Sequence, residues 1–200
     1  MMIKEPLYSI KESLYLRLGL IKDDNIRNFT EQALNYADEE FWTYPSSLSG
    51  RYHPKENNGI GGLVRHTIKT IDIAKGLGEF MLYGNTSRDI TIAGAMLHDI
   101  KKGGDDWFNY PAIHGLLAYE WLKDLEYKGP IDELIKEDIL NCVRYHMRQF
   151  SEPKSEAVRA VNATDTEQIV QIADHISSRK ELSFLPGLEL SDKIIKSYLR

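Results

Sequence analysis

Several features that mark special classes of protein are missing from this 200-residue sequence. With one cysteine, Cys142, the chain cannot form an internal disulfide, which excludes disulfide-stapled folds and fits a reducing compartment. No apolar run approaches the roughly 18 residues that a membrane-spanning helix requires. The first stretch, MMIKEPLYSIKESLYL, carries acidic side chains and no sustained apolar segment, unlike a signal peptide. We therefore expect a cytoplasmic protein without a membrane partner.

An excess of basic side chains is also missing. The 25 Lys and Arg residues are outnumbered by 30 Asp and Glu residues, which gives a net charge of −5. Nonspecific binding to duplex nucleic acid needs a basic face, so we expect no duplex partner. A small phosphorylated ligand is compatible with this charge, because divalent cations bound at one place would make that place positive inside an acidic protein.

Alternating strand patterns are absent, whereas apolar residues at helical spacing run through most of the chain. The predicted fold class is all-α, a single-domain helical bundle. Helices are expected at these places: from a cap at Asp23 or Asp24 to Phe41, from Leu63 through Leu77, from a cap at Thr86 or Ser87 to Gly103, from Pro111 onward, from Ile131 to Met147, from a cap at Thr164 or Asp165 onward, and over Ser191–Tyr198. The first two are separated by a long loop, TYPSSLSGRYHPKENNGIGG, and such loops are often functional.

Histidines and aspartates on these segments could together bind metal ions. The candidates are His66, His98, Asp99, His114, His146 and Asp174. Asp174 lies among large apolar residues in IVQIADHIS, where a buried carboxylate is costly unless it is paired or bound to a metal. Exposure to solvent, or a pair with Arg179 or Lys180, is the alternative for this residue.

Three motifs in this order resemble the HD-domain superfamily of metal-dependent phosphohydrolases: GGLVRHT, AGAMLHDIKK and IVQIADHISSR. The resemblance covers residues 59–182 and implies a helical metal-binding core there. A helical segment with the long loop, residues 1–58, is expected to pack on that core, and residues 183–200 to form a helical tail. The resemblance implies hydrolysis of a phosphomonoester or phosphodiester in a nucleotide, a short oligonucleotide or another small molecule.

The resemblance also implies a set of ligands. The matching positions are His66, His98, Asp99 and Asp174 for one metal, with His114 and His146 for a second. Imidazoles and carboxylates in this mixture suit Mn, Fe, Co, Ni or Zn. Asp99 would bridge two ions, and a metal-activated hydroxide would be the nucleophile. Two-metal relatives often carry adjacent histidines near His146, so one metal, with His114 and His146 as substrate contacts, is the alternative.

Basic side chains near the motifs are candidate substrate contacts. Lys102 matches the lysine of the family's His-Asp-Ile-Gly-Lys motif and is expected to assist catalysis as a point charge on a phosphate oxygen. Arg144 and Arg148 flank His146 and could bind phosphate through their guanidinium forks. Arg51 and His53 lie in the long loop before the first candidate ligand. For each of these residues, a solvated position on the surface is the alternative.

Two other functions are compatible with the same residues. Some proteins of the HD fold hold a mixed-valent di-iron centre and oxidise small polyols or phosphonates, and the ligand order does not separate them from hydrolases. A ligand-binding HD domain without catalytic activity is the third reading. The presence of all six ligand residues argues against it.

Overall fold

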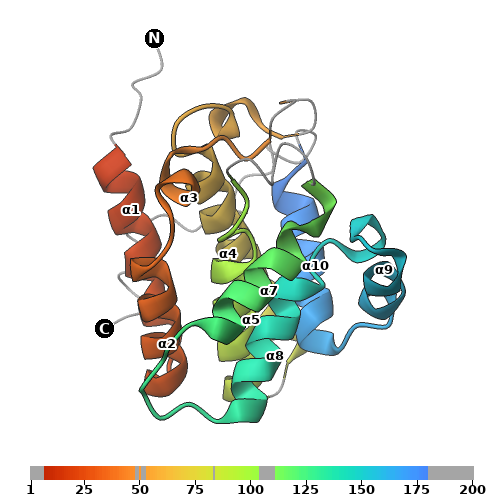
Figure 1. Cartoon of the computed structure of the whole chain (residues 1–200). Coiled ribbons are helices and arrows are strands. Elements are labelled where there is room, and N and C mark those ends of the chain that lie inside the picture. The colour runs from red at the N-terminus through yellow and green to blue at the C-terminus, as the bar shows by residue number, and fades with distance from the viewer. Residues whose placement is uncertain (1–6, 48–49, 51–52, 83, 104–110, 180–200) are drawn as a thin grey trace.

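The protein is described by a computed structural model that covers residues 7–47, 50, 53–82, 84–103 and 111–179. Its centre is the long helix α4 (Gly62–Met81), which packs against α5 (Asn85–Leu97) and α10 (Asp165–Ser177). Helix α5 also packs against α8 (Glu133–Arg144), so the four central helices share one apolar core (Figure 1). The described residues contain no β-strand, and the all-α prediction is confirmed.

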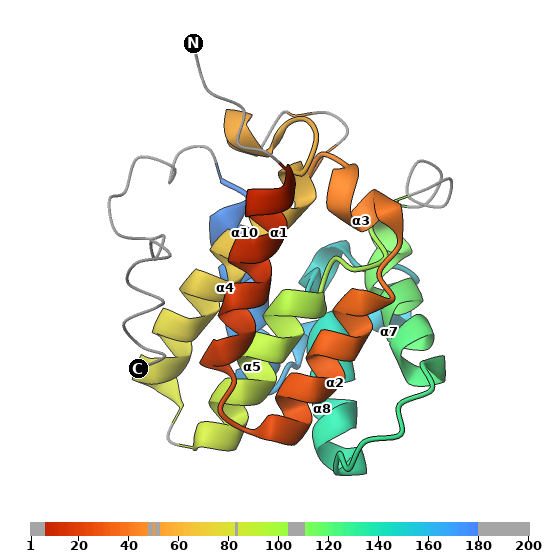
Figure 2. The same ribbon diagram turned by 90° about the vertical axis from the view of Figure 1, so that its left-hand side faces the viewer.

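Shorter helices surround this centre. Helices α1 (Leu7–Leu16) and α3 (Glu39–Thr43) pack on α4, while α2 (Asp24–Asn35) packs on α5 (Figure 2). Helix α7 (His114–Asp124) packs on α8, and α9 (Lys154–Val161) packs on the 3₁₀ turn η4 (Arg148–Phe150). Three further 3₁₀ turns are η1 (Arg17–Leu20), η2 (Lys55–Asn57) and η3 (Pro111–Ile113). Over the described ranges, no helix has the length and apolar character needed to cross a bilayer.

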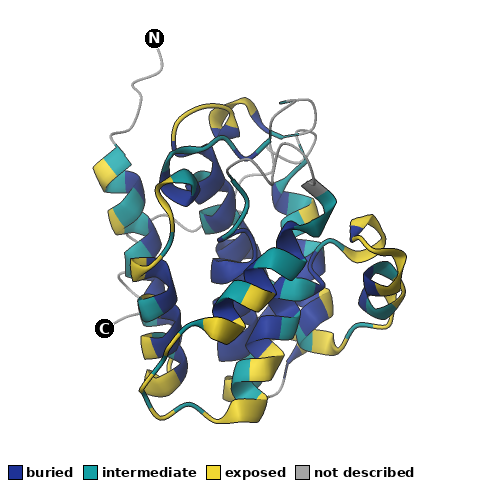
Figure 3. Cartoon of the chain, viewed as in Figure 1, coloured by how far each residue is buried: buried dark blue, intermediate teal, exposed yellow. Residues whose placement is uncertain are grey.

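Burial follows this arrangement. Helices α4 and α5 are buried over most of their length, whereas α8 and α9 expose one face to solvent (Figure 3). Two glycines allow unusually close approach between helices. A Cβ atom at Gly94 of α5 would lie 2.5 Å from Cβ of Cys142 on α8, and one at Gly115 of α7 would lie 2.7 Å from the carbonyl oxygen of Arg144. Real Cβ atoms do not tolerate such distances, so the two glycines set how closely α5 and α7 approach α8.

Two predicted helix starts are confirmed by their caps. The side chain of Asp23 accepts hydrogen bonds from the backbone N–H groups of Asn25 and Ile26, which satisfies the first turn of α2. Thr164 forms a capping box with Glu167 at the start of α10.

Other boundaries differ from the predictions. The first predicted helix ends at Asn35, and Phe41 belongs to the separate helix α3. Helix α5 begins after Gly84 without a side-chain cap, so the caps predicted at Thr86 and Ser87 are wrong. It ends at Leu97, because the chain turns there, and the predicted end at Gly103 is also wrong. Helix α8 runs over Glu133–Arg144 rather than from Ile131 to Met147. The helix predicted over Ser191–Tyr198 lies outside the described residues.

Candidate metal centre

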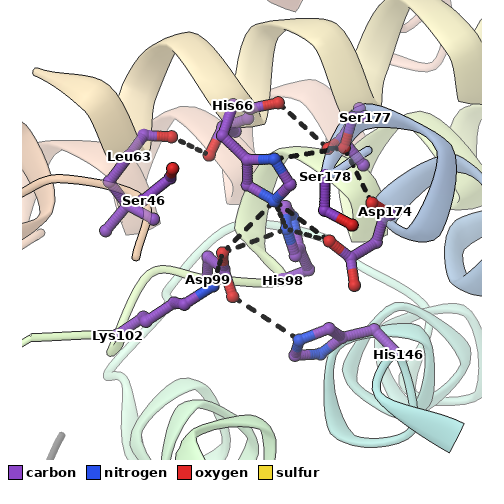
Figure 4. Close-up of polar contacts among 12 residues, drawn as sticks. Ser46, Leu63, His66, His98, Asp99, Lys102, His146, Asp174, Ser177 and Ser178 are labelled. Carbon is purple, nitrogen blue, oxygen red and sulfur yellow. Dashed lines mark hydrogen bonds and ion pairs between the residues drawn. The ribbon is translucent and has the colours of Figure 1, made fainter. Parts of the chain in front are cut away.

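The six candidate ligands converge from different parts of the chain on one largely buried place. Figure 4 shows His66, His98, Asp99, His146 and Asp174 there. His66 lies near the start of α4, and Asp174 lies within α10. His98 and Asp99 occupy the turn directly after α5. His114 is the first residue of α7, and His146 follows α8 by two residues. Their side chains form two groups, and within each group the ligand atoms lie within 4.8 Å of one another. The first cluster is His66, His98 and Asp174, and the second cluster is Asp99, His114 and His146.

In the first cluster two imidazoles face one carboxylate. The Nε2 atoms of His66 and His98 are 3.3 Å apart. Oδ1 of Asp174 lies 3.0 Å from Nε2 of His66 and 3.7 Å from Nε2 of His98. Both imidazoles are fully buried, while the Asp174 side chain is 22% exposed, so this cluster is open to solvent on the side of α10.

In the second cluster the Nε2 atoms of His114 and His146 are 3.0 Å apart. They lie 3.0 and 3.5 Å, respectively, from Oδ1 of Asp99. All three side chains are buried. The two clusters therefore contain the same chemical groups, two imidazoles and one carboxylate each.

Asp99 joins the two clusters. Its Oδ1 faces His114 and His146, whereas its Oδ2 lies 3.5 Å from Nε2 of His66 and 3.3 Å from Nε2 of His98. Oδ1 is buried and makes no hydrogen bond of acceptable geometry to any described residue. A buried carboxylate oxygen without a hydrogen bond is costly unless a cation compensates it. Each oxygen of Asp99 is thus directed at a separate pair of imidazoles.

Backbone carbonyls fix which nitrogen of two imidazoles carries a proton. Nδ1 of His98 is 2.7 Å from the carbonyl oxygen of Ala95, and Nδ1 of His146 is 2.6 Å from that of Val143. A carbonyl oxygen can only accept, so each Nδ1 donates its N–H. In the neutral imidazole, Nε2 then presents its lone pair to the cluster. This is the arrangement that metal-binding histidines normally have.

A hydroxyl network braces His66 in the same way. Nδ1 of His66 is 3.1 Å from Oγ of Ser177, which in turn is 2.9 Å from the carbonyl oxygen of Asp174 (Figure 4). Because that carbonyl only accepts, the Ser177 hydroxyl donates to it and accepts from His66. Thr70 on α4 adds a second hydroxyl, 2.9 Å from Ser177. Ser177 is not among the residues that the motifs predict, although its place three residues after Asp174 was a usable signal.

The electrostatic environment keeps Asp99 ionised but affects the imidazoles differently. Burial lowers the pKa of His66 and His114, which favours their neutral forms. Burial also acts to lower the pKa of His98, but the adjacent carboxylate of Asp99 raises it above its usual value. Burial alone would raise the pKa of Asp99, but the positive charges of His98 and Lys102 lower it well below its usual range. Neutral imidazoles and ionised carboxylates are the forms that bind metal ions.

In the first cluster, Nε2 of His66, Nε2 of His98 and Oδ1 of Asp174 face one another at about 3 to 3.7 Å. Their lone pairs repel unless a cation lies between them, so these ligand atoms fit a divalent metal ion.

The predicted substrate contacts occupy different surroundings. Nζ of Lys102 lies 2.8 Å from Oδ2 of Asp99, directly beside the clusters. The ring centroid of His53 is 5.1 Å from that of His66, and burial lowers the pKa of His53 to about 3. Nδ1 of His53 is 3.0 Å from Oγ of Ser46, another residue that the sequence motifs do not predict. These contacts bring Lys102 and His53 to the centre.

The two arginines that flank His146 separate in the structure. Arg144 forms a bidentate ion pair with Glu156, at 2.6 and 2.7 Å, and its guanidinium lies over the ring of Tyr119. The structure therefore does not bring Arg144 to the clusters, because its guanidinium fork is occupied by a carboxylate on α9. Arg148 is exposed and lines a pocket next to the centre. Arg51 lies outside the described residues.

Comparison with known proteins assigns the family. The profile of the HD domain matches residues 63–179. No solved structure matches the chain. The matched segment is more than half of the chain and contains both clusters. The chain therefore belongs to the HD domain family, a superfamily of metal-dependent phosphohydrolases.

Proposed function

We propose that this protein is a metal-dependent phosphohydrolase that acts on a nucleotide or another small phosphoester and uses two divalent transition-metal ions, one in each cluster. The observation that carries the proposal is the position of Asp99, whose two oxygens face two separate pairs of imidazoles. A carboxylate placed between two sites can bind an ion with each oxygen. The ligands proposed are His66, His98 and Asp174 for one ion, His114 and His146 for the other, and Asp99 for both.

The proposed reaction is hydrolysis of a phosphate ester. Water adds to phosphorus, the ester P–O bond breaks, and the departing oxygen gains a proton. When bound, divalent ions supply Lewis-acid chemistry, since they lower the pKa of water and offset the charge of the phosphate. The protein's own groups hold the ligand atoms in place through the Nδ1 hydrogen bonds of His98 and His146.

Lys102 and His53 are the proposed substrate contacts beside the clusters. The Lys102 ammonium is partly exposed next to Asp99, where its charge can hold a phosphate oxygen. The Ser46 hydroxyl lies 3.1 Å from the carbonyl oxygen of Asn57 and donates to it, so Nδ1 of His53 donates to Ser46. Nε2 of a neutral His53 is then an acceptor, suited to a hydroxyl of the substrate or to water.

The test is element analysis of the purified protein, followed by phosphoester hydrolysis with Mn²⁺, Fe²⁺, Co²⁺, Ni²⁺ and Zn²⁺. We expect about two ions per chain and hydrolysis of nucleotides and of bis(p-nitrophenyl) phosphate. A protein that binds no metal under any of these conditions would contradict the proposal. Oxygen uptake together with the EPR signal of a mixed-valence iron pair, without hydrolysis, would establish the oxygenase instead.

A further inference from the structure

A pocket of about 300 Å³ opens beside the metal centre, between η4 and α10. His146 of the second cluster and Asp174 of the first cluster form part of its wall, so the pocket and the candidate centre are continuous. This volume is at the lower end of the range for small-molecule sites. Whatever occupies the pocket is therefore adjacent to the groups at the centre.

The wall of the pocket is positively charged. Arg148 and Arg179 contribute guanidinium groups, and Asp174 is the one carboxylate among the described lining residues. The guanidinium of Arg179 contacts the ring nitrogens of His175 at 3.3 Å. The Arg148 side chain makes no hydrogen bond or ion pair with any residue that the structure describes, so its fork can bind an anion.

The backbone of Arg148 is unusual. Its φ angle is +52°, in the left-handed region that residues with a side chain seldom adopt. Such conformations occur preferentially at functional sites, where the surrounding structure holds them. The amide of Gln171 on α10 holds this region, since it donates to the carbonyl oxygens of Tyr145 and Ala160, each at 2.9 Å. The turn that carries Arg148 is thus fixed to α10 rather than free.

The same wall presents apolar surface. Phe150, the last residue of η4, lines the pocket, and 63% of its surface is exposed. Ile172 and Ile176 of α10 line it too. An exposed aromatic ring and a guanidinium in one pocket could bind a base that is joined to a phosphate. Any of the bases can stack on an aromatic side chain.

We propose that this pocket binds the part of the substrate beyond the reacting phosphate, and that this part carries a second phosphate and a base. The substrate class is then a 5′-phosphorylated dinucleotide or a longer single strand with this end. Arg148 binds the second phosphate, and Phe150 stacks on the base. The inference rests on the proposed hydrolase function, because it places the bond to be cleaved at the metal centre.

The experiment compares two diesters in the metal-loaded protein. One is a 5′-phosphorylated dinucleotide, and the other is bis(p-nitrophenyl) phosphate, which has no second phosphate. We expect Arg148→Gln to lower kcat/KM for the dinucleotide by about 10- to 100-fold, mostly through a higher KM. A loss of this size is what removal of a charge-assisted hydrogen bond causes. Phe150→Leu should lower it by about 5-fold or more. Hydrolysis of bis(p-nitrophenyl) phosphate should change less than 2-fold in both variants.

Matched controls separate these effects from general damage. Phe80→Leu changes an aromatic ring on α4 that is 91% exposed and does not line the pocket, and Arg27→Gln removes a guanidinium on α2. Both should leave the two substrates unaffected. Arg148→Gly removes the guanidinium, and glycine adopts the left-handed backbone conformation of this position without strain. The variant protein should therefore lose its preference for the dinucleotide without loss of thermal stability.

Each outcome decides between the two proposals. Equal effects of Arg148→Gln on both diesters, or no effect on either, would overturn the pocket assignment while hydrolysis stands. If the wild-type protein hydrolyses neither diester, the hydrolase function fails, and calorimetry with a phosphorothioate-linked, 5′-phosphorylated dinucleotide still tests the pocket. Binding that is weakened about 10-fold by Arg148→Gln would support the pocket, and undetectable binding to the wild-type protein would overturn it.

Discussion

The first and second clusters contain the same kinds of side chain but are supported differently. In the first, His66 and Asp174 lie within helices, and the hydroxyls of Thr70 and Ser177 brace the His66 imidazole. Its other histidine, His98, lies in the turn after α5 and donates to a backbone carbonyl. In the second, both histidines lie at helix ends, and a carbonyl and a close helix approach hold them. The first cluster thus depends on which faces of α4 and α10 meet and on the turn after α5. The second depends on where α7 begins and α8 ends.

The largest effect is expected where the clusters meet. Asp99→Asn removes the negative charge that both clusters share, so we expect most bound metal to be lost and hydrolysis to fall by about 1,000-fold or more. Element analysis and phosphate release measure the two effects. Asp138→Asn, an exposed carboxylate on α8, is the control and should change neither. A fully active Asp99→Asn protein would refute the assignment of the centre.

Single-ligand variants test whether the clusters bind separate ions. His66→Ala should empty the first cluster and His114→Ala the second, so each variant should bind about one ion where the wild type binds two. Hydrolysis should fall by about 100-fold in each, because a two-metal reaction needs both ions. Metal content per folded chain is the measurement. If His114→Ala and His146→Ala leave the metal content unchanged, the centre binds one metal and these histidines contact substrate.

The hydroxyl brace of the first cluster should have a smaller effect. Ser177→Ala removes the acceptor that orients Nδ1 of His66, and we expect metal affinity at the first cluster to fall by about 10- to 100-fold. A metal titration monitored by calorimetry measures the loss. The neighbouring Ser178→Ala removes a hydroxyl that bonds to the carbonyl of His175 and is the matched control. Equal affinities in the two variants would show that Ser177 does not position His66.

The close approach of α7 and α8 gives the smallest expected effect, on stability. Gly115→Ala places a Cβ 2.7 Å from a backbone oxygen, so α7 must shift, and we expect a loss of about 1 to 3 kcal/mol. Gly76→Ala, in α4 with open space around it, should instead stabilise by about 0.5 to 1 kcal/mol. Denaturant unfolding measures both. A neutral Gly115→Ala would show that the second cluster does not depend on this contact.

The comparison also explains how much the sequence could predict. Local signals were reliable at two helix starts, where Asp23 and Thr164 cap their helices as short-range hydrogen-bonding rules predict, but not at α5, where the predicted caps at Thr86 and Ser87 are wrong. The candidate ligands could be named because the histidines and aspartates lie in motifs of a known family. Their convergence on one centre, with Asp99 between the two clusters, is visible only in three dimensions.

The predictions failed where long-range packing decides. Apolar residues continue past Leu97 to Ile100, so periodicity could not reveal the turn that ends α5. Helix α9 and the ion pair of Arg144 with Glu156 join segments whose pairing depends on the fold. Composition alone could not show that Arg148, rather than Arg144, remains available to a ligand.

The spread of the proposed ligands along the chain has a consequence for folding. They run from residue 66 to residue 174, so ions held by them would tie together loops that span more than half of the chain. A protein with a single, buried cysteine has no covalent cross-link of this kind. Because a ligand that binds only the native state raises the free energy of unfolding by RT ln(1 + [L]/Kd), metal occupancy adds to stability. The melting temperature of this protein would then report the supply of metal ions around it.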